Sequence, residues 1–165
     1  MYTIHATEKL LDRVRQPIGT PVNQPSTALG NWYATGIFWK PQVALFVNEA
    51  TLLPVLVPLA PAAKLAERFP EQLGRVLDRL GTPPEFVFSE VGAMTTAVYA
   101  KTANRSVVGS MVDFEFLAGV YRNHESDLVK LSARLAGVPC APLRNRGSFP
   151  DRALAAVVTE TLGDV

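Results

Sequence analysis

Residues 43–57 constrain the fold more than any other segment, because apolar side chains occupy both alternating sets of positions there. Only Asn48, Glu49 and Thr51 are polar in this stretch. A strand with one face in water alternates polar and apolar residues, whereas a strand that is covered on both faces is a nearly continuous apolar run. At least one strand in this segment is therefore expected to be covered on both faces, which requires a helical layer.

Further strands are expected on both sides of this segment. Aromatic and β-branched residues at 32–39 precede a turn at 40–42, which favours a hairpin with 43–47. Residues 52–58 contain Pro54 and Pro58, which donate no backbone hydrogen bond, so this strand is expected at a sheet edge. Short strands are also predicted at 2–5, 86–88 and 95–102.

Helices are predicted where apolar residues recur at helical spacing. The first should follow Thr7 as N-cap and end near Arg15, and a kinked helix containing Pro70 should cover 61–80. A third is expected to begin at Ser110, which resembles a cap. Two more are predicted from 126–127 to the stop before Gly137, and over 151–162.

Strands thus dominate the first sixty residues and helices the last fifty. This segregation predicts an α+β fold with a mostly antiparallel sheet of about four to six strands and helices packed largely on one face, and it disfavours a doubly wound parallel sheet. The 165 residues correspond to a single domain, 1–165. Residues 16–28 hold three prolines and are expected to be a proline-rich surface loop, either functional or mobile.

Composition narrows the classes of function. Sixteen Lys and Arg against fifteen Asp and Glu leave a net charge of +1, so nucleic-acid binding is not indicated by charge. The single cysteine forms no internal disulfide, and no segment is long and apolar enough to span a membrane, which together favour a cytoplasmic protein without membrane contact. The common phosphate, zinc and nucleophile motifs are absent, so no metal and no cofactor are predicted.

Residues 101–106 are the densest polar segment and lie between a predicted strand and a predicted helix. Lys101, Asn104, Arg105 and Ser110 are candidates for anion binding, because a helix start presents free amide donors and nearby cations attract phosphate or carboxylate. The alternative is that Asn104 forms a turn, Ser110 caps the helix, and the cations are solvated or paired.

Other polar or aromatic residues are candidates for a ligand or partner surface. Asn31, Trp32 and Tyr33 leave the proline-rich loop, where aromatic rings can stack on a base or sugar or can simply pack in the core. Asn48 is a further surface candidate, although a tight turn would also explain it. Glu49 and Asp113 are weak catalytic candidates as proton carriers.

Three residues of types that often carry chemistry are expected to be structural here. His5 and His124 are more typical of packed or surface residues than of metal ligands. Cys140 lies close to Pro139 and Pro142 without a nearby activating group, and it is interpreted as a small buried apolar residue.

Five segments together resemble an uncharacterised bacterial family, domain of unknown function 6933. They are residues 6–11, 29–34, 45–55, 101–111 and 139–143, and they span most of the chain. The resemblance implies a bacterial, cytoplasmic protein. It transfers no activity and no catalytic residue.

Two hypotheses of function remain. The first is a non-catalytic binding or regulatory module whose partner is a protein, a second copy of the chain or a nucleic acid. The alternative is a small enzyme that acts on a phosphorylated or RNA substrate, with an anion site at the 101–110 strand-to-helix loop and Glu49 or Asp113 moving a proton.

Overall fold

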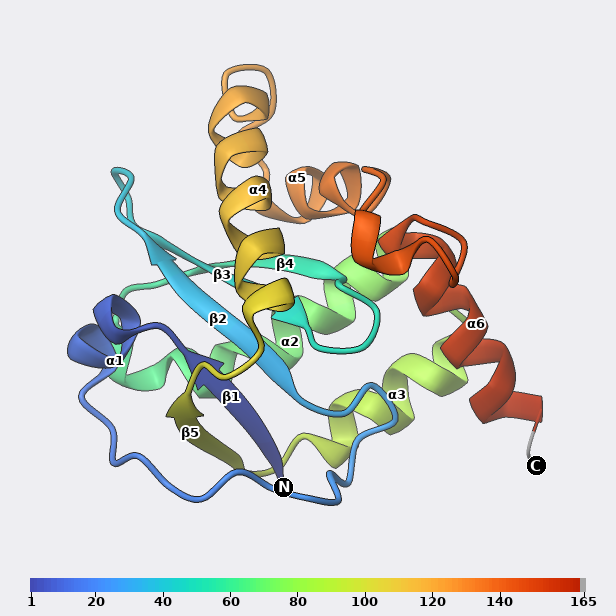
Figure 1. Ribbon diagram of the computed structural model, residues 1–165, viewed down its shortest axis with the longest axis horizontal. Coiled ribbons are helices and arrows are strands. Elements are labelled where there is room, and N and C mark those ends of the chain that lie inside the picture. The colour runs from blue at the N-terminus through green and yellow to red at the C-terminus, as the bar shows by residue number, and fades with distance from the viewer. Residues whose placement is uncertain (164–165) are drawn as a thin grey trace.

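The computed structural model describes residues 1–163 and contains one five-stranded sheet with helices on both sides (Figure 1). The strand order is β4-β3-β2-β1-β5. The strands are β1 (Tyr2–Ala6), β2 (Trp32–Ile37), β3 (Val43–Asn48), β4 (Pro54–Pro58) and β5 (Ala97–Lys101). The predicted α+β class and the predicted number of strands are confirmed, and so is the edge position of the proline-containing strand β4.

The sheet is mixed, which corrects the mostly antiparallel prediction. Strands β2, β3 and β4 pair antiparallel, as the hairpin pattern predicted, but β1 pairs parallel with both β2 and β5. The reason is that β1, the first strand of the chain, lies between two strands that it reaches through long connections. All five residues of β1 are buried as a result.

One face of the sheet is covered by α1 (Glu8–Val14), α2 (Leu65–Arg79), α3 (Pro84–Ala93) and α6 (Pro150–Gly163). Its core contains Ile4, Trp32 and Phe46, which point to this face from three neighbouring strands. Phe69 of α2 stacks on Phe46 with the ring centroids 3.9 Å apart. We call this face the α2 face.

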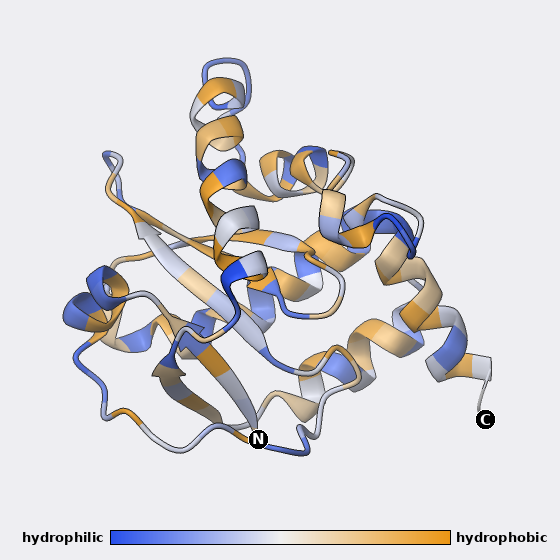
Figure 2. Cartoon of the chain, viewed as in Figure 1, coloured by the Kyte–Doolittle hydropathy of each residue, from blue (hydrophilic) through white to orange (hydrophobic). Residues whose placement is uncertain are grey.

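The opposite face is covered by α4 (Arg105–Tyr121) and α5 (Leu128–Leu135), and we call it the α4 face. Tyr33 and Leu45 of the sheet belong to the same core cluster as Met111 and Phe114 of α4. Helices cover both faces of the sheet, which corrects the expectation that they lie largely on one face. This coverage agrees with residues 43–57, whose apolar side chains on both strand faces required it. Figure 2 shows this run as predominantly orange strands between the helices.

The segment 15–31 has no helix and joins β1–α1 to β2 along the β5 edge of the sheet (Figure 1). Ile18 forms a parallel bridge with Tyr99, and the Val22 N–H donates to Thr3 Oγ1 at 2.7 Å. At its far end the carboxylate of Glu90 in α3 accepts the N–H groups of Ala28 and Leu29 at 2.8 and 2.7 Å. The proline-rich loop is therefore held to the sheet and to α3 at several points.

Two local predictions are wrong. Residues 86–88, predicted as a strand, belong to α3, which begins with Pro84 at its first turn, where proline costs a helix little. Helix α4 begins at Arg105, five residues before the predicted start at Ser110. Short 3-10 turns also occur at Ala62–Lys64 and Ala141–Leu143.

Candidate functional site

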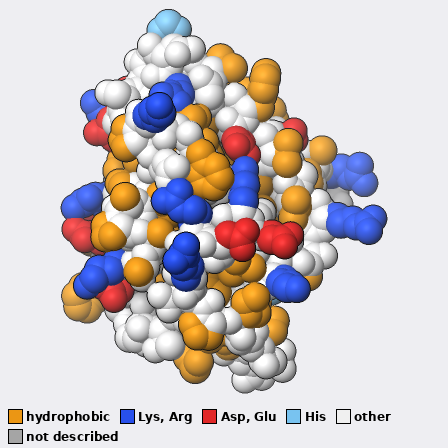
Figure 3. Space-filling model, turned by 90° about the vertical axis from the view of Figure 1, so that its left-hand side faces the viewer, with side chains coloured by type: hydrophobic (Ala, Val, Ile, Leu, Met, Phe, Trp, Pro, Cys, Tyr) orange, Lys and Arg blue, Asp and Glu red, His pale blue; other side chains and the backbone are white. Residues whose placement is uncertain are grey.

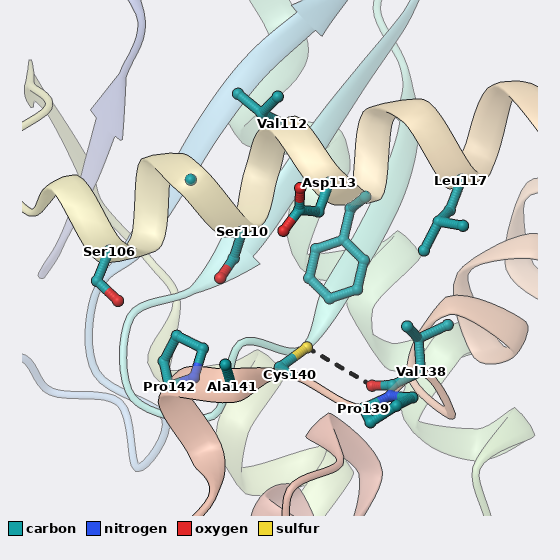
Figure 4. Close-up of a pocket in the computed structure, with 12 residues that line it drawn as sticks. Ser106, Ser110, Val112, Asp113, Leu117, Val138, Pro139, Cys140, Ala141 and Pro142 are labelled. Carbon is teal, nitrogen blue, oxygen red and sulfur yellow. Dashed lines mark hydrogen bonds between the residues drawn. The ribbon is translucent and has the colours of Figure 1, made fainter.

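The main candidate site is a groove between α4 and the segment 138–142, which follows α5 (Figure 4). We call it the α4 groove. Its volume is about 490 Å³, within the range of sites that hold small molecules or side chains of a partner. Two of the segments by which the sequence resembles a family, 101–111 and 139–143, meet here. The lining residues are Ser106, Gly109, Ser110, Val112, Asp113, Phe114, Leu117, Val138, Pro139, Cys140, Ala141 and Pro142.

Four polar side chains line this groove within a mainly apolar wall. Ser106, Ser110 and Asp113 come from α4, and Cys140 faces them from the other wall (Figure 4). Asp113 is exposed, and Ser110 is only 7% exposed. These hydroxyl and carboxylate groups can donate or accept hydrogen bonds with a bound molecule.

Cys140 is unsuited to act as a nucleophile. Burial, and secondarily the negative charge of Asp113, raise the pKa of its thiol to about 11, so the thiol stays protonated at neutral pH. Its Sγ donates a weak hydrogen bond to the carbonyl of Val138 at 3.5 Å. Neither histidine of the chain lines the groove, so no imidazole activates the thiol or a serine hydroxyl there. The groove is therefore better suited to binding than to covalent catalysis.

The amino end of α4 is closed by Asn104, whose side-chain oxygen accepts the N–H groups of Ser106 and Val107 at 2.9 and 3.3 Å. Asn104, and not Ser110, is the N-cap. Ser110 lies inside the helix and faces the groove. Because Asn104 occupies two of the free amides of the helix start, an anion near Lys101 and Arg105 would have to be held mainly by side chains.

Trp32 and Tyr33 are buried in the sheet and point to opposite faces. Trp32 is 0% exposed and packs edge-to-face on Phe69, with the ring centroids 4.9 Å apart. Tyr33 stacks on His5, and its hydroxyl oxygen accepts the Asn104 N–H at 2.8 Å. Both rings serve packing, so neither offers the surface that the sequence suggested for a ligand or partner.

Asn31 and Asn48 hold the backbone together beneath the proline-rich loop. Asn31 Oδ1 accepts the Thr3 N–H at 2.8 Å. Asn48 is 0% exposed, donates to the carbonyl of Leu29 at 2.8 Å, and accepts from the N–H and the hydroxyl of Thr51 at 2.9 and 3.0 Å. The structure gives both amides a role in fixing connections.

The predicted polar residues do not all meet at one place. Lys101 pairs with Ala6 at the carboxyl end of β1, whereas Asn31 immediately precedes the Trp32–Ile4 pair, nearer the amino end. Glu49 is exposed in the turn that follows β3, and its N–H donates to the carbonyl of Asn31 at 3.1 Å. The groove brings Ser110 and Asp113 together, and the carboxyl end of β5 brings Lys101, Asn104 and Arg105 together.

The outer face of α4 is a feature that the sequence prediction missed. Val112, Phe116 and Val120 are 61%, 71% and 47% exposed and follow one another at four-residue spacing. We call them the outer stripe. Val112 also lines the rim of the groove, whereas Phe116 and Val120 do not, so the stripe and the groove adjoin along α4 (Figure 4). Apolar residues on both sides of α4 are visible in the sequence, and this pattern could have revealed the stripe.

Charge on the surface is mixed. On the side of the molecule that presents α1 and the β2–β3 turn, basic and acidic side chains are interspersed with apolar ones (Figure 3). Lys9 of α1 pairs with Glu115 of α4 at 3.7 Å. This face has no broad basic surface of the kind that binds nucleic acid.

Two features of the described residues concern metals and membranes. Within residues 1–163, no group of three or more His, Cys, Asp or Glu side chains is arranged to hold a metal ion. No helix in the same range combines the length and the apolar character needed to cross a bilayer.

Fold and groove together define an α+β protein with a single mixed sheet, two helical layers and a side groove suited to binding. The chain belongs to an uncharacterised domain family, domain of unknown function DUF6933, which matches residues 3–153. Comparison with curated proteins and comparison with solved structures each found no match.

Proposed function

We propose that the protein is a non-catalytic binding module of the bacterial cytoplasm, and that it takes an apolar segment of a protein partner in the α4 groove. The observation that carries this proposal is a groove of about 490 Å³ with a mainly apolar wall, which no histidine lines and whose thiol is held protonated. Such a site can bind and orient a partner, but it offers neither an imidazole nor a thiolate for covalent catalysis.

Shape and chemistry of the groove support a peptide segment as the occupant. Phe114, Leu117 and Pro139 offer apolar contact, and Ser106 and Asp113 offer hydrogen bonds. Apolar contact with a few polar anchors is typical of grooves that bind partner segments. The outer stripe lies on the adjoining face of α4 and would extend the contact area beyond the groove.

The test compares two variants that separate the groove from the stripe. Ser106→Trp fills the groove from an exposed helix position, and Phe116→Asp places a charge on the outer stripe at a residue that does not line the groove. Tagged wild-type protein should retain a defined partner through affinity capture and chemical crosslinking at the groove rim, and Ser106→Trp should lose it. Unchanged capture by Ser106→Trp would contradict the groove as the binding site.

A second copy of the chain is the simplest partner to examine. Size-exclusion chromatography with light scattering reports whether the protein self-associates, and whether Ser106→Trp or Phe116→Asp abolishes the association. A strictly monomeric protein that captures no partner under any of these conditions would count against a binding module.

A small enzyme that acts on a phosphorylated or RNA substrate is the second candidate function. One observation favours it: Lys101 and Arg105, at the carboxyl end of β5 and the start of α4, are exposed and form no ion pair within residues 1–163. Glu49 lies away from this end of the sheet, and Asp113 faces the α4 groove, so a reaction there would have to use other groups. Turnover of a phosphomonoester by wild-type protein, lost in Arg105→Met, would support this candidate over the first.

A further inference from the structure

Helices α2 and α3 enclose a second groove, on the side of the sheet that α2 covers. Residues 80–83 join the two helices into a hairpin, and the groove along it has a volume of about 600 Å³. Val91 and Val87 of α3 pack against Gly74 of α2, 3.4 and 3.7 Å from the place that a Cβ would take there. We call this groove the hairpin groove. It is separate from the α4 groove, because α2 and α4 cover opposite faces of the sheet.

Helix α3 turns apolar side chains outward. Pro84, Phe88, Val91 and Gly92 line the hairpin groove, and Phe88 is 85% exposed. Glu90, in contrast, is only 2% exposed, and its carboxylate binds backbone N–H groups inside the protein. A surface helix of a globular protein normally has the reverse arrangement, with its polar residues facing solvent. An outward apolar face of this kind marks a surface that another protein covers.

A projection and a hollow lie side by side on this surface. Phe88 stands out beside the groove, and Gly74 and Gly92 line the groove without a side chain. A copy of the chain related by a two-fold axis presents the same two features in reverse, so the Phe88 ring of each copy can enter the groove of the other. A second copy is therefore complementary to this surface in shape.

The charged rim of the hairpin groove also fits a second copy. Glu71, Arg75 and Asp78 of α2 line the groove, and Arg75 pairs with Glu71 at 2.7 Å. A surface for anionic lipid or nucleic acid has an excess of basic side chains, whereas this rim carries both signs. Arg75 and Asp78 have opposite charges and are three residues apart, so an antiparallel copy of α2 places Arg75 of each copy against Asp78 of the other.

The antiparallel arrangement also brings the two Phe88 rings together. Its two-fold axis crosses α2 between Arg75 and Asp78, less than one helical turn beyond Gly74. Because α3 runs back along α2 and its Val87 lies beside Gly74, the same axis crosses α3 close to Phe88. Charge and shape therefore favour the same pairing.

The size of the surface suits a reversible dimer. Helices α2 and α3 contain 15 and 10 residues, so side by side they cover about 20 Å by about 20 Å. Both copies together then bury on the order of 1,000 Å², at the lower end of the range for specific protein interfaces. An interface of this size is typical of a dimer that forms and dissociates.

We propose that two copies of the chain associate through the hairpin groove, with α2 antiparallel to its counterpart and Phe88 of each copy packed in the groove of the other. The inference is independent of the partner proposed for the α4 groove. In this dimer each α4 groove lies on the far side of its own sheet, so both remain accessible to that partner.

Analytical ultracentrifugation of the full chain over a concentration series tests the dimer. Wild-type protein should assemble to the mass of two chains by about 100 µM, a concentration at which a dimer with a micromolar Kd is largely formed. Phe88→Ala should raise the Kd of the dimer at least about tenfold, because buried aromatic side chains dominate interfaces. Wild-type protein that stays monomeric at this concentration, or an unchanged Kd in Phe88→Ala, would overturn the proposal.

Gly92→Arg fills the groove without disturbing the fold. Among the described residues, no atom of another residue packs within 4 Å of the Cβ position of Gly92, and arginine is a better helix former than glycine. The variant should therefore melt at or above the wild-type temperature and remain monomeric. A stable Gly92→Arg protein that dimerises like wild type would refute the groove as the interface.

Variants on α4 separate this dimer from the function proposed above. Phe116→Asp on the outer stripe and Ser106→Trp in the α4 groove should both dimerise like wild type. If either of them dissociates the dimer and Gly92→Arg does not, the copies meet at α4 and the present inference is wrong. If Ser106→Trp loses a captured partner while the dimer persists, the two surfaces act separately, as proposed.

A charge reversal tests the antiparallel pairing of α2. Arg75→Asp alone and Asp78→Arg alone each place like charges against each other across the two-fold axis, and each should dimerise several times more weakly than wild type. In a mixture of the two variants, opposite charges face each other again at both contacts. Native mass spectrometry should therefore show mostly mixed dimers. Mixed dimers at only the statistical proportion would refute this pairing.

Discussion

Replacing Asn48 by alanine is expected to lower stability strongly, because this fully buried amide joins three segments of backbone. Its Nδ2 donates to the carbonyls of Leu29 and Asn31 at 2.8 and 3.3 Å. Its Oδ1 accepts the N–H of Ala50, the N–H of Thr51 and the Thr51 hydroxyl. The substitution removes all five hydrogen bonds in one step.

The size of this destabilisation depends on which hydrogen-bond partners of Asn48 stay buried in the variant. Ala50 is exposed, so water can replace its lost hydrogen bond. The Thr51 N–H and the Leu29 carbonyl belong to residues that are only 1% and 3% exposed, and each would lose its partner. An unsatisfied buried group costs about 1–3 kcal/mol, which gives a total of about 2–6 kcal/mol. For a chain of this length, that cost lowers the melting temperature by about 5–20 °C.

Urea unfolding followed by circular dichroism measures the change, with Glu49→Ala as the control. Glu49 is the exposed neighbour of Asn48, and its replacement should alter the unfolding free energy by no more than about 0.5 kcal/mol. Asn48→Asp preserves the shape but turns a donor towards two carbonyl oxygens into an acceptor, so it should also destabilise at neutral pH. If Asn48→Ala unfolds at the wild-type urea concentration, the structural role assigned to this amide is refuted.

Three further predictions concern charge, the thiol and the start of α4. Burial raises the pKa of Glu90 above its ordinary value of 4.5, despite the backbone N–H groups whose hydrogen bonds its carboxylate accepts. The folded state therefore binds this proton more tightly than the unfolded chain, and the contribution of Glu90 to stability falls as pH rises through the raised pKa. Between pH 4 and pH 7, the urea midpoint of Glu90→Gln should therefore change differently from the midpoints of wild type and of the exposed control Glu160→Gln. Parallel changes in all three proteins would contradict this prediction. Cys140, with a thiol pKa of about 11, should react with iodoacetamide at pH 7.5 roughly 100-fold more slowly than an unhindered thiol, and rapid labelling would show that the thiol is activated. Asn104→Ala should lower the free energy of unfolding by about 0.5–2 kcal/mol through loss of the N-cap, and Ser110→Ala should lower it much less. A larger effect at Ser110 would place the start of α4 where the sequence suggested.

Local patterns predicted the elements well because most of them depend on nearby residues. Apolar spacing located helices α2, α5 and α6, and the prolines of β4 placed this strand at the edge. The position of β1 could not be obtained in this way, because its neighbours β2 and β5 are distant in sequence and pair with it through tertiary contacts. A short strand of mixed character, YTIHA, gives no sign that both of its edges will be paired.

The start of α4 was misplaced for a related reason. Asn104 and Ser110 are both acceptable N-caps, and sequence alone does not show which oxygen meets the amides. In the structure Asn104 is fixed by its own N–H on Tyr33 Oη, a contact between residues 71 positions apart. This long-range contact starts the helix one and a half turns earlier than predicted, which moves Ser110 from the helix end into the wall of the groove.

Polar residues that interrupt apolar segments were predicted as ligand contacts, but the side chains of Asn31 and Asn48 form hydrogen bonds with backbone groups of the protein itself. A connection that leaves a buried sheet carries N–H and carbonyl groups that need partners, and a short amide side chain supplies both a donor and an acceptor. A buried polar residue therefore points to a ligand only where one of its atoms stays unpaired. Asn48 does not meet that condition, because its side-chain nitrogen and oxygen are both paired. Apolar side chains call for a different criterion, which is exposure without a packing partner in the core. Val112 and Phe116 of α4 are 61% and 71% exposed, and they therefore identify a surface on which this protein can bind something else.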